Sequence, residues 1–151
     1  MATLHFVPQH EEEQTLSGNT IGTEASEALA KCIAENTQVR ESLVEVNFAD
    51  LYTSRLVDEV VDSLKFLLPV LLKCPHLEIV NLSDNAFGLR TIELLEDYIA
   101  HAVNIKHLIL SNNGMGPFAG ERIGKAPFHL AQNKKAASKP FWKLLSVVEI
   151  D

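Results

Sequence analysis

Residues 77–88 read LEIVNLSDNAFG, and the spacing within this stretch decides the fold. Apolar side chains recur at Leu77, Val80 and Leu82, and Asn85 follows three positions after the last of them. Alternate residues of a strand point to the same face, so Val80 and Leu82 would face one interior. An asparagine side chain can bond backbone groups where regular strand pairing has ended. The stretch therefore predicts a short buried strand that leads into a turn held by Asn85.

A second copy of the pattern occupies residues 105–116, IKHLILSNNGMG. Its apolar positions and its asparagine fall in the same places, at Ile105, Leu108, Leu110 and Asn113. This L-x-x-L-x-L-x-x-N spacing is the signature of the leucine-rich repeat. A repeated match predicts an array of stacked units rather than an isolated strand.

Weaker copies of the pattern flank these two. Residues 42–51, SLVEVNFADL, keep the apolar spacing but place Leu51 where the asparagine would stand. Residues 145–150 repeat the apolar spacing near the C-terminus, which predicts a fifth strand there. Residues 15–22, TLSGNTIG, contain Asn19 but only the end of the pattern. The first repeat is therefore expected to lack a strand of its own.

The segments between the strands have the period of amphipathic helices. Helices are expected over 23–35, 56–72, about 90–101, and from about Pro117 onward. The first helix is expected to bury one face made of Ala25, Ala28, Leu29, Cys32 and Ile33. Pro69 and Pro127 lie inside two of these segments, and each should bend or end its helix. The basic stretch 131–140 is expected to be a loop.

The last apolar positions of successive copies lie 28 to 40 residues apart, which leaves room for a helix in every repeat. We therefore predict an α/β leucine-rich repeat solenoid of about four to five repeats. It would be a ribonuclease-inhibitor-like crescent, with parallel strands on the concave face and helices outside. Such a surface favours binding of another protein over chemistry.

Composition narrows the possible functions. The chain has 151 residues, 46% of them hydrophobic, so it can bury one core. We expect a flexible acidic segment over 1–14 and a repeat domain over 15–151. No apolar run approaches the roughly 20 residues that cross a bilayer, and no signal peptide is apparent. The net charge of −7 disfavours nucleic-acid binding. The expected protein is a monomer of the cytosol or nucleus.

Neither a cofactor nor a metal is expected. Cys32 and Cys74 lack C-x-x-C spacing and are interpreted as reduced thiols in the core, and the six histidines show no ligand spacing. The chain also lacks G-x-S-x-G, a P-loop and a paired catalytic Cys and His, so it is not expected to be a free-standing enzyme.

The chain resembles the Ran GTPase-activating proteins, in particular the fungal ones, in an ordered set of short runs. These runs are LSGNTIGTEA, LLKCP, LSDNAFG, NNGMGP with AGERI, and NKKA, and they span most of residues 16–140. The resemblance implies a regulator that stimulates hydrolysis by a GTP-bound Ran-type GTPase in nucleocytoplasmic transport, in the cytoplasm or at the nuclear envelope. The family's later repeats and acidic tail do not occur in this sequence, so it resembles a truncated or internally deleted member. The alternative is a leucine-rich repeat binding module that has lost the activity.

The resemblance also implies roles for two residues. Asn112, the first asparagine of NNGMGP, would orient the catalytic Gln of the GTPase, and Arg55 matches a functionally important arginine. GTP hydrolysis depends on a positioned water and an oriented Gln more than on new covalent chemistry. An amide can both donate to and accept from that Gln. From the residues alone, Asn112 is interpreted as a plain loop residue beside Asn113, and Arg55 is equally interpretable as a solvated charge at a helix start.

Four more residues on the loops after strands are candidates for contact with the partner: Asn19, Asp84, Asn85 and Asn113. Asp84 could contact a basic group. For Asn19 and Asn85, the alternative role of holding the turn stays open at this point.

Overall fold

A computed structural model of the chain describes residues 2–5, 20–136 and 148–149, and describes side chains over 20–126. The strands are β1 (Ala2–His5), β2 (Leu43–Asn47), β3 (Ile79–Asn81), β4 (His107–Ile109) and β5 (Val148–Glu149). The helices are α1 (Thr23–Glu35), α2 (Thr37–Ser42), α3 (Val57–Leu71), the 3-10 helix η1 (Leu89–Thr91), α4 (Ile92–His101) and α5 (Gly116–Ala136).

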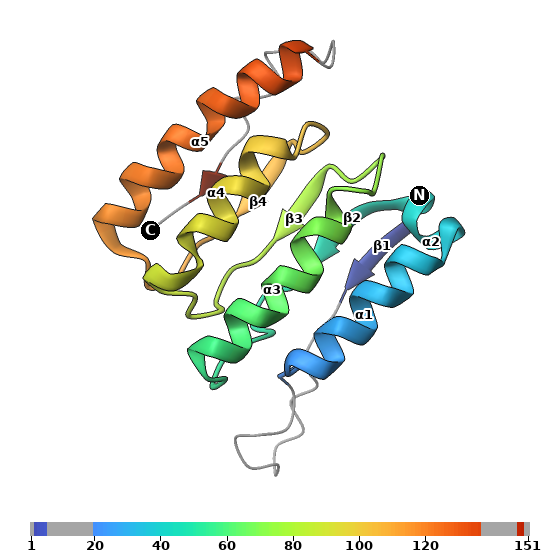
Figure 1. Cartoon of the computed structure of the whole chain (residues 1–151), viewed down its shortest axis with the longest axis horizontal. Helices are drawn as coiled ribbons and strands as arrows, with labels where there is room; N and C mark the ends of the chain where they lie inside the picture. Colours follow the sequence, from blue (N-terminus) through green and yellow to red (C-terminus); the bar gives the residue numbers. More distant parts are fainter. Residues whose placement is uncertain (1, 6–19, 137–147, 150–151) are drawn as a thin grey trace.

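The five strands form one parallel sheet in the order β1-β2-β3-β4-β5. Helices α1, α3, α4 and α5 lie side by side across one face of it (Figure 1). Val46, Val80 and Leu108 occupy the same register in neighbouring strands, and all three are buried. The parallel strands expected near 43–48, 78–82 and 106–110 are confirmed, as is a leucine-rich repeat type of fold.

Backbone pairing continues past the ends of the strands. The N–H of Phe48 donates to the carbonyl of Asn81 at 2.8 Å, and that of Leu82 to the carbonyl of Ile109 at 2.8 Å. Leu82 therefore lies opposite Leu110 in the adjacent repeat, and both are buried. The last apolar position of each copy thus belongs to one continuous core.

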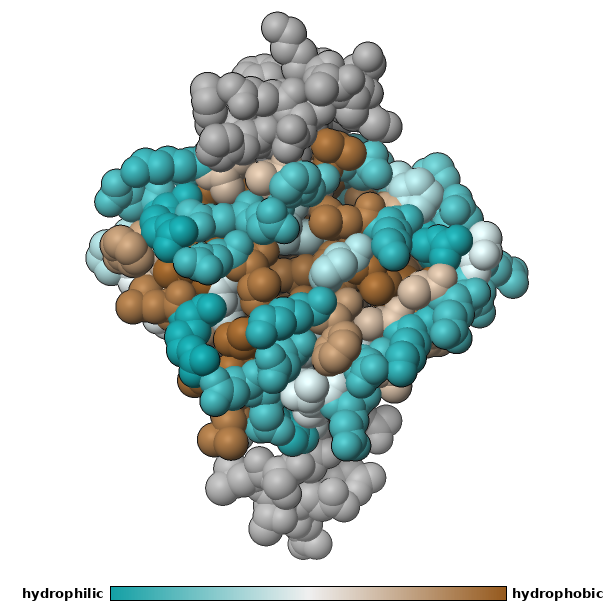
Figure 2. Space-filling view, viewed as in Figure 1, coloured by the Kyte–Doolittle hydropathy of each residue, from teal (hydrophilic) through white to brown (hydrophobic). Residues whose placement is uncertain are grey.

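The helices close this core from one side. Helix α4 buries Ile92, Leu95 and Ile99, with Ala102 buried just after it, and α5 buries Ala119, Ile123 and Ala126. Figure 2 shows hydrophilic side chains along the helices on the outside, with hydrophobic residues in the seams between them. An ion pair between Arg122 of α5 and Glu96 of α4 joins two helices at 2.5 Å.

The buried face of α1 agrees with the expected one at Ile33, and in part at Leu29, but is otherwise rotated. Its interior residues are Ser26, Ala30 and Ile33, whereas Ala25, Ala28 and Cys32 are exposed. A small alanine contributes little apolar area, so one polar contact can decide the rotation of such a helix. Ser26 is buried because its hydroxyl pairs with the Tyr52 hydroxyl at 2.9 Å. The interpretation of Cys32 as a core residue is wrong; Cys74 is buried as expected.

Part of the N-terminal segment belongs to the sheet. Ala2–His5 form β1, which pairs in parallel with β2 at the place that the first repeat leaves vacant. The expectation of a flexible segment over 1–14 is therefore wrong at these four residues, and the rest of that segment lies outside the described residues. Within the expected fifth strand at 145–150, Val148–Glu149 pair in parallel with β4, and the remaining positions lie outside the described residues.

Neither proline divides its helix. Helix α3 includes Pro69 near its C-terminal end and runs unbroken from Val57 to Leu71. Helix α5 runs from Gly116 to Ala136 through Pro127. Of the two expected outcomes, an end of the helix at Pro127 is wrong, and a bend there stays a prediction. Residues 131–136 of the expected loop are likewise helical. Helix α5 packs against α4, and tertiary packing of this kind can offset the local cost of a proline, which is about 3 kcal/mol in a helix interior.

Candidate functional site

Three loops lie along one edge of the sheet, because parallel strands all end at the same edge. They follow β2, β3 and β4 and comprise residues 48–56, 82–88 and 110–116; we call them the ridge loops. They contain Arg55, Asp84, Asn85, Asn112 and Asn113, five of the six residues singled out from the sequence. Asn19 lies outside the described residues.

The second and third ridge loops share one backbone conformation. Three pairs of equivalent residues have positive φ: Asp84 (60°) and Asn112 (55°), Ala86 (52°) and Gly114 (65°), Gly88 (62°) and Gly116 (68°). This region of φ suits Gly, Asn and Asp and strains other residue types. The repeat is therefore preserved in the turns as well as in the strands.

Asn85 holds two neighbouring loops together from the inside. Its Oδ1 accepts from the N–H of Leu51 at 2.8 Å and from that of Tyr52 at 2.9 Å. Its Nδ2 contacts three carbonyl oxygens, those of Phe48 at 2.9 Å, Leu82 at 2.8 Å and Ser83 at 3.0 Å. The side chain has no exposed surface. These bonds satisfy buried backbone groups that the strands no longer pair.

Asn113 has the same role one repeat later. Its Oδ1 accepts from the N–H of Asn85 at 2.8 Å, and its Nδ2 donates to the carbonyls of Leu82 at 3.0 Å and Leu110 at 2.8 Å. It is 2% exposed. Because both amides are buried and fully engaged, the structure corrects the expectation that Asn85 and Asn113 contact a partner. Both side chains hold the loops instead. For Asn85, this is the alternative role that the sequence analysis had left open.

A different row of side chains faces outward on the ridge loops. Asp50, Asp84 and Asn112 occupy equivalent positions, two residues after the last apolar residue of each copy, with φ of 55°, 60° and 55°. Nδ2 of Asn112 donates to Oδ1 of Asp84 at 2.8 Å. The Thr53 hydroxyl donates to the carbonyl of Asp84 at 2.9 Å and contacts the Asp50 carboxylate. Asp84, Asn112 and Thr53 are exposed, so this row can meet another molecule.

Arg55 lies at the far end of the first ridge loop and faces α1 rather than Asn112. Its Nε donates to the Thr20 hydroxyl at 2.9 Å, its guanidinium donates to the Thr20 carbonyl at 2.5 Å, and Glu59 lies 3.8 Å away. The loop that carries Asp84 separates Arg55 from Asn112. The structure therefore does not bring the two residues with implied roles into contact.

Two side chains that the sequence reasoning missed stabilise the first ridge loop. Thr53 links it to the second loop, and Tyr52 anchors it in the core. The Tyr52 hydroxyl contacts Ser26, its ring lies 6.5 Å from that of Phe87, and burial raises its pKa to about 12. The signal was available in LYTSRL, where an aromatic residue follows the degenerate asparagine position.

Large apolar side chains are exposed where the helices leave the ridge loops. Leu56, Leu89 and Phe118 are 73%, 58% and 59% exposed, and they stand in comparable places in three successive repeats. These side chains are available for contact with another protein beside the outward row.

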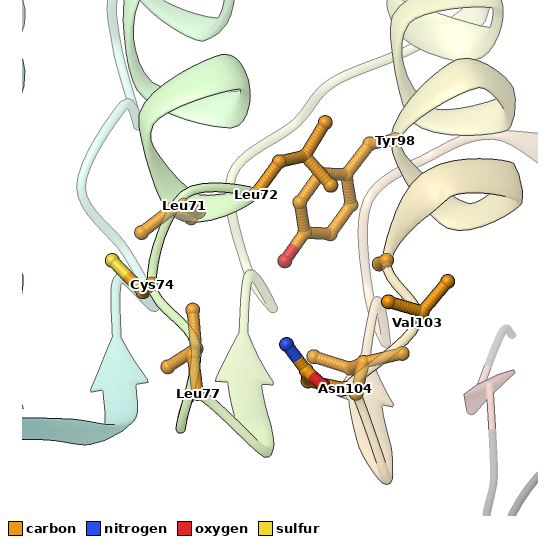
Figure 3. A pocket seen from close by; sticks show the side chains of 9 residues that line it. Leu71, Leu72, Cys74, Leu77, Tyr98, Val103 and Asn104 are labelled. Atoms are coloured by element: carbon orange, nitrogen blue, oxygen red, sulfur yellow. The ribbon is translucent and has the colours of Figure 1, made fainter. Parts of the chain in front are cut away.

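A small pocket lies at the opposite edge of the sheet, near the C-terminal ends of α3 and α4. It is about 20 Å³ in volume, and its lining includes Cys74, Tyr98 and Asn104. The Tyr98 hydroxyl points into it (Figure 3). This volume suits one water molecule and is far below that of a cofactor site. Burial raises the pKa of the Cys74 thiol to about 11, which makes it a poor nucleophile.

Within the described ranges, no group of three or more His, Cys, Asp or Glu residues is placed to hold a metal ion. In the same part of the chain, no helix combines the length and apolar character needed to cross a membrane.

Comparison with known proteins gives a consistent result. A sequence-family profile described as "Leucine Rich repeat" matches residues 73–90. The chain is 80% identical to Ran GTPase-activating protein 1 of Saccharomyces cerevisiae over 174 residues, covering 93% of this chain and 43% of the relative. It is 31% identical to the Ran GTPase-activating protein of Drosophila melanogaster over 141 residues, covering 91% of this chain and 22% of the relative. It is 36% identical to Ran GTPase-activating protein 2 of Caenorhabditis elegans over 126 residues, covering 82% of this chain and 13% of the relative.

The chain spans less than half the length of these curated relatives. Moreover, the yeast alignment is 174 residues long, whereas 93% of the 151 residues is about 140, so about 34 residues of the relative have no counterpart within the matched part. This difference agrees with the expectation of an internally deleted member. Since most of its length aligns with proteins of this name from yeast, fly and worm, the chain belongs to the Ran GTPase-activating protein family.

Proposed function

We propose that this chain stimulates GTP hydrolysis by a Ran-type small GTPase in its GTP-bound form, and that it performs no catalysis alone. Family membership supports this activity. The observation that assigns the surface for the GTPase is the position of Asn112. This amide is exposed on a rigid loop, directly beside the buried Asn113 that holds the loop in place. An exposed amide on such a frame can meet the GTPase without any rearrangement of the repeat.

Asn112 would act by orientation. The GTPase supplies its own catalytic Gln, and the Asn112 amide would bond that side chain and so restrict both the Gln and the attacking water. Orientation of reacting groups can lower a barrier by several kcal/mol, and up to about 7–11 kcal/mol in the best intramolecular cases. The buried asparagines keep the position of the amide constant, so little of this gain would be lost in ordering the loop.

The surface for the GTPase would combine the exposed Asp84 and Asn112 of the outward row with their apolar neighbours, and would not include the half-buried Asp50. Asp84 and Asn112 supply polar groups, and Leu89 and Phe118 supply apolar area at the starts of the next helices. Arg55 would act at one side of this surface, either as a charge toward the GTPase or through its bonds to Thr20. We propose that the complex contains one copy of this chain and forms in the cytoplasm or at the nuclear envelope.

A second candidate function is binding without stimulation. The ridge loops, with Leu89 and Phe118 exposed beside them, would support such binding whether or not Asn112 orients the Gln of the GTPase. Both candidates predict a complex with the GTPase. They differ in the rate of hydrolysis within that complex.

Single-turnover hydrolysis separates the two. A Ran-type GTPase loaded with GTP is mixed with increasing amounts of this chain, and the rate at saturation and the half-saturating concentration are measured separately. The activator function predicts a saturable increase in rate that Asn112→Gly largely abolishes. Glycine accepts the positive φ of this position, so the variant removes the amide without straining the turn. Binding with no increase in rate would leave only the binding-module function.

A further inference from the structure

The carboxylate of Asp84 and the amide of Asn112 form a direct pair on the outward row. Nδ2 of Asn112 is 2.8 Å from Oδ1 of Asp84, although 28 residues separate them in sequence. Both residues are exposed and both have positive φ. The pair therefore links equivalent positions of two successive repeats.

The backbone around this pair is fixed at several points. The N–H of Asp84 donates to the carbonyl of Ser111 at 3.0 Å, so the residue before Asn112 is tied to Asp84 itself. The N–H of Asn85 donates to Oδ1 of Asn113 at 2.8 Å, which ties the residues that follow. Thr53 donates to the carbonyl of Asp84 from the other side at 2.9 Å. The carboxylate thus meets the amide from a rigid frame, not from a mobile loop.

The chemistry of the pair gives the amide a direction. An ionised carboxylate only accepts hydrogen bonds, whereas the two ends of an asparagine amide differ: NH₂ donates and the carbonyl oxygen accepts. The contact with Asp84 therefore favours one of the two orientations that differ by a flip of the amide. The NH₂ end lies toward Asp84, and Oδ1 is turned away from it.

We propose that Asp84 is a positioning residue that sets the orientation of the Asn112 amide and presents its Oδ1 to the NH₂ group of the GTPase's Gln. The first part of this inference, the orientation of the Asn112 amide, rests on the contact between Asp84 and Asn112. The second part, the bond to the Gln of the GTPase, rests on the proposed function. It replaces the role of Asp84 as a contact for a basic group. Asp84 then acts on hydrolysis through Asn112 and does not touch the reacting atoms.

The kinetic test uses variants that keep the positive φ. Asp84→Gly removes the carboxylate, and Asp84→Asn keeps the shape but offers Asn112 either an oxygen or an NH₂. Asp50→Gly is the matched control, because Asp50 has the same conformation and charge one repeat earlier and pairs with Thr53 instead of Asn112. Each variant is assayed for single-turnover hydrolysis by the GTP-loaded GTPase, alone and combined with Asn112→Gly.

Asp84→Gly should lower the rate at saturation by about tenfold or more, since small misplacements of a positioning group cost up to about a hundredfold. The half-saturating concentration should change by less than about twofold, and Asp84→Asn should be intermediate. In the Asn112→Gly background Asp84→Gly should have no further effect. Loss confined to the half-saturating concentration, full additivity, or an equal loss in Asp50→Gly would overturn the proposal.

A second measurement needs no GTPase. The side-chain NH₂ resonances of Asn112 are followed by NMR in the chain alone. In the wild type they should have separated shifts and slowed hydrogen exchange, and Asp84→Gly should move them to the values of a solvated amide, while Asp50→Gly should not. If the wild type fails to stimulate hydrolysis, the proposed function is wrong, and these resonances still decide whether Asp84 holds the amide. Unchanged resonances in Asp84→Gly would overturn that contact.

Discussion

The backbone N–H of Asn85 donates to the side-chain Oδ1 of Asn113 at 2.8 Å, and Asn85 in turn accepts from the N–H groups of Leu51 and Tyr52. Each buried asparagine thus fixes the loop of the repeat before it. The buried asparagines hold successive ridge loops in the same conformation. The outward-facing residues therefore stand in equivalent positions from one repeat to the next.

The two adjacent asparagines Asn112 and Asn113 should respond differently to substitution. Asn113→Ala would remove the side-chain partner of the buried Asn85 N–H and of the Leu110 carbonyl, while the Leu82 carbonyl would keep Nδ2 of Asn85. The free energy of unfolding should therefore fall by about 2–4 kcal/mol. Asn112→Gly should cost less than about 1 kcal/mol, because that side chain is exposed. Urea unfolding followed by circular dichroism measures both. Equal losses would mean that the inward and outward roles are not separate.

Equivalent positions in the two loops allow a reciprocal exchange. Ala86 has φ of 52° where the next repeat has Gly114 at 65°. A left-handed conformation costs a residue with a Cβ roughly 1–2 kcal/mol in the folded state. Glycine avoids this strain, but its unfolded chain is more flexible, and the added unfolded-state entropy cancels part of the gain. We expect Ala86→Gly to raise the free energy of unfolding by about 0.5–1 kcal/mol and Gly114→Ala to lower it similarly. Thermal midpoints should move in opposite directions; a shift in the same direction would contradict the conformational argument.

Stability should decline in alkali. Tyr52 ionises near pH 10 when unfolded, but burial raises its pKa to about 12 in the folded protein. Between these values the unfolded chain binds fewer protons than the folded one, so the free energy of unfolding falls as pH rises. The full contribution is present below pH 10, and roughly 3 kcal/mol is lost by pH 12. Burial also raises the pKa of Cys74 to about 11 and that of Tyr98, which adds to the decline.

Urea midpoints at several pH values from 8 to 12 test this. Tyr52→Phe should start lower, by about 1 kcal/mol for the lost bond to Ser26, and then decline less steeply. A variant with the same slope as the wild type would remove Tyr52 from the explanation.

Pro127→Leu should raise the thermal midpoint. Helix α5 continues through this position to Ala136, so the proline removes one helical donor and crowds the preceding turn. The gain should approach about 3 kcal/mol if the helix bears the full cost, and less if it bends locally to relieve it. Differential scanning calorimetry of the two chains measures the shift. An unchanged midpoint would show that Pro127 causes no strain in this helix.

Arg55→Ala should act on affinity more than on the rate within the complex. The guanidinium bonds Thr20 and lies near Glu59, so its loss loosens the join between the first ridge loop and the start of α1. We expect a higher half-saturating concentration in the hydrolysis assay, with a difference from wild type that salt reduces. Arg55→Lys keeps the charge but not the paired bonds and separates the two causes. A fall in the saturating rate alone would assign Arg55 to the reaction itself.

Much of this fold follows from spacing alone. Leu77, Val80, Leu82 and Asn85 predicted both a buried strand and a held turn, because each of these positions has one environment in a repeat. The rotation of α1 did not follow, since its face consists of small residues and the Ser26 contact comes from a loop 26 residues away. The unbroken α5 did not follow either, because the expectation at Pro127 rested on a local preference, whereas the packing of α5 against α4 is a property of the assembled fold.

The site was predictable in part. Spacing showed that Asn85 and Asn113 are equivalent. It did not show that their amides are buried, a property that distinguishes them from Asn112, the exposed neighbour of Asn113. The pairing of Asp84 with Asn112 depends on register between two loops, and register is a property of the assembled sheet. Arg55 matched a motif, but its contacts with Thr20 required knowledge of where α1 begins.

Strand β1 has a consequence for how separate molecules meet. An open sheet edge presents a row of unpaired backbone groups that can recruit a strand from another chain and so begin aggregation. Ala2–His5 lie along β2 and use the backbone groups on that side within the same molecule. β1 then forms the edge in place of β2, with four residues against the five of β2, and a shorter edge strand offers fewer unpaired groups. Loss of these first few residues should therefore leave the ridge loops unchanged in composition while making the protein more prone to self-association at high concentration.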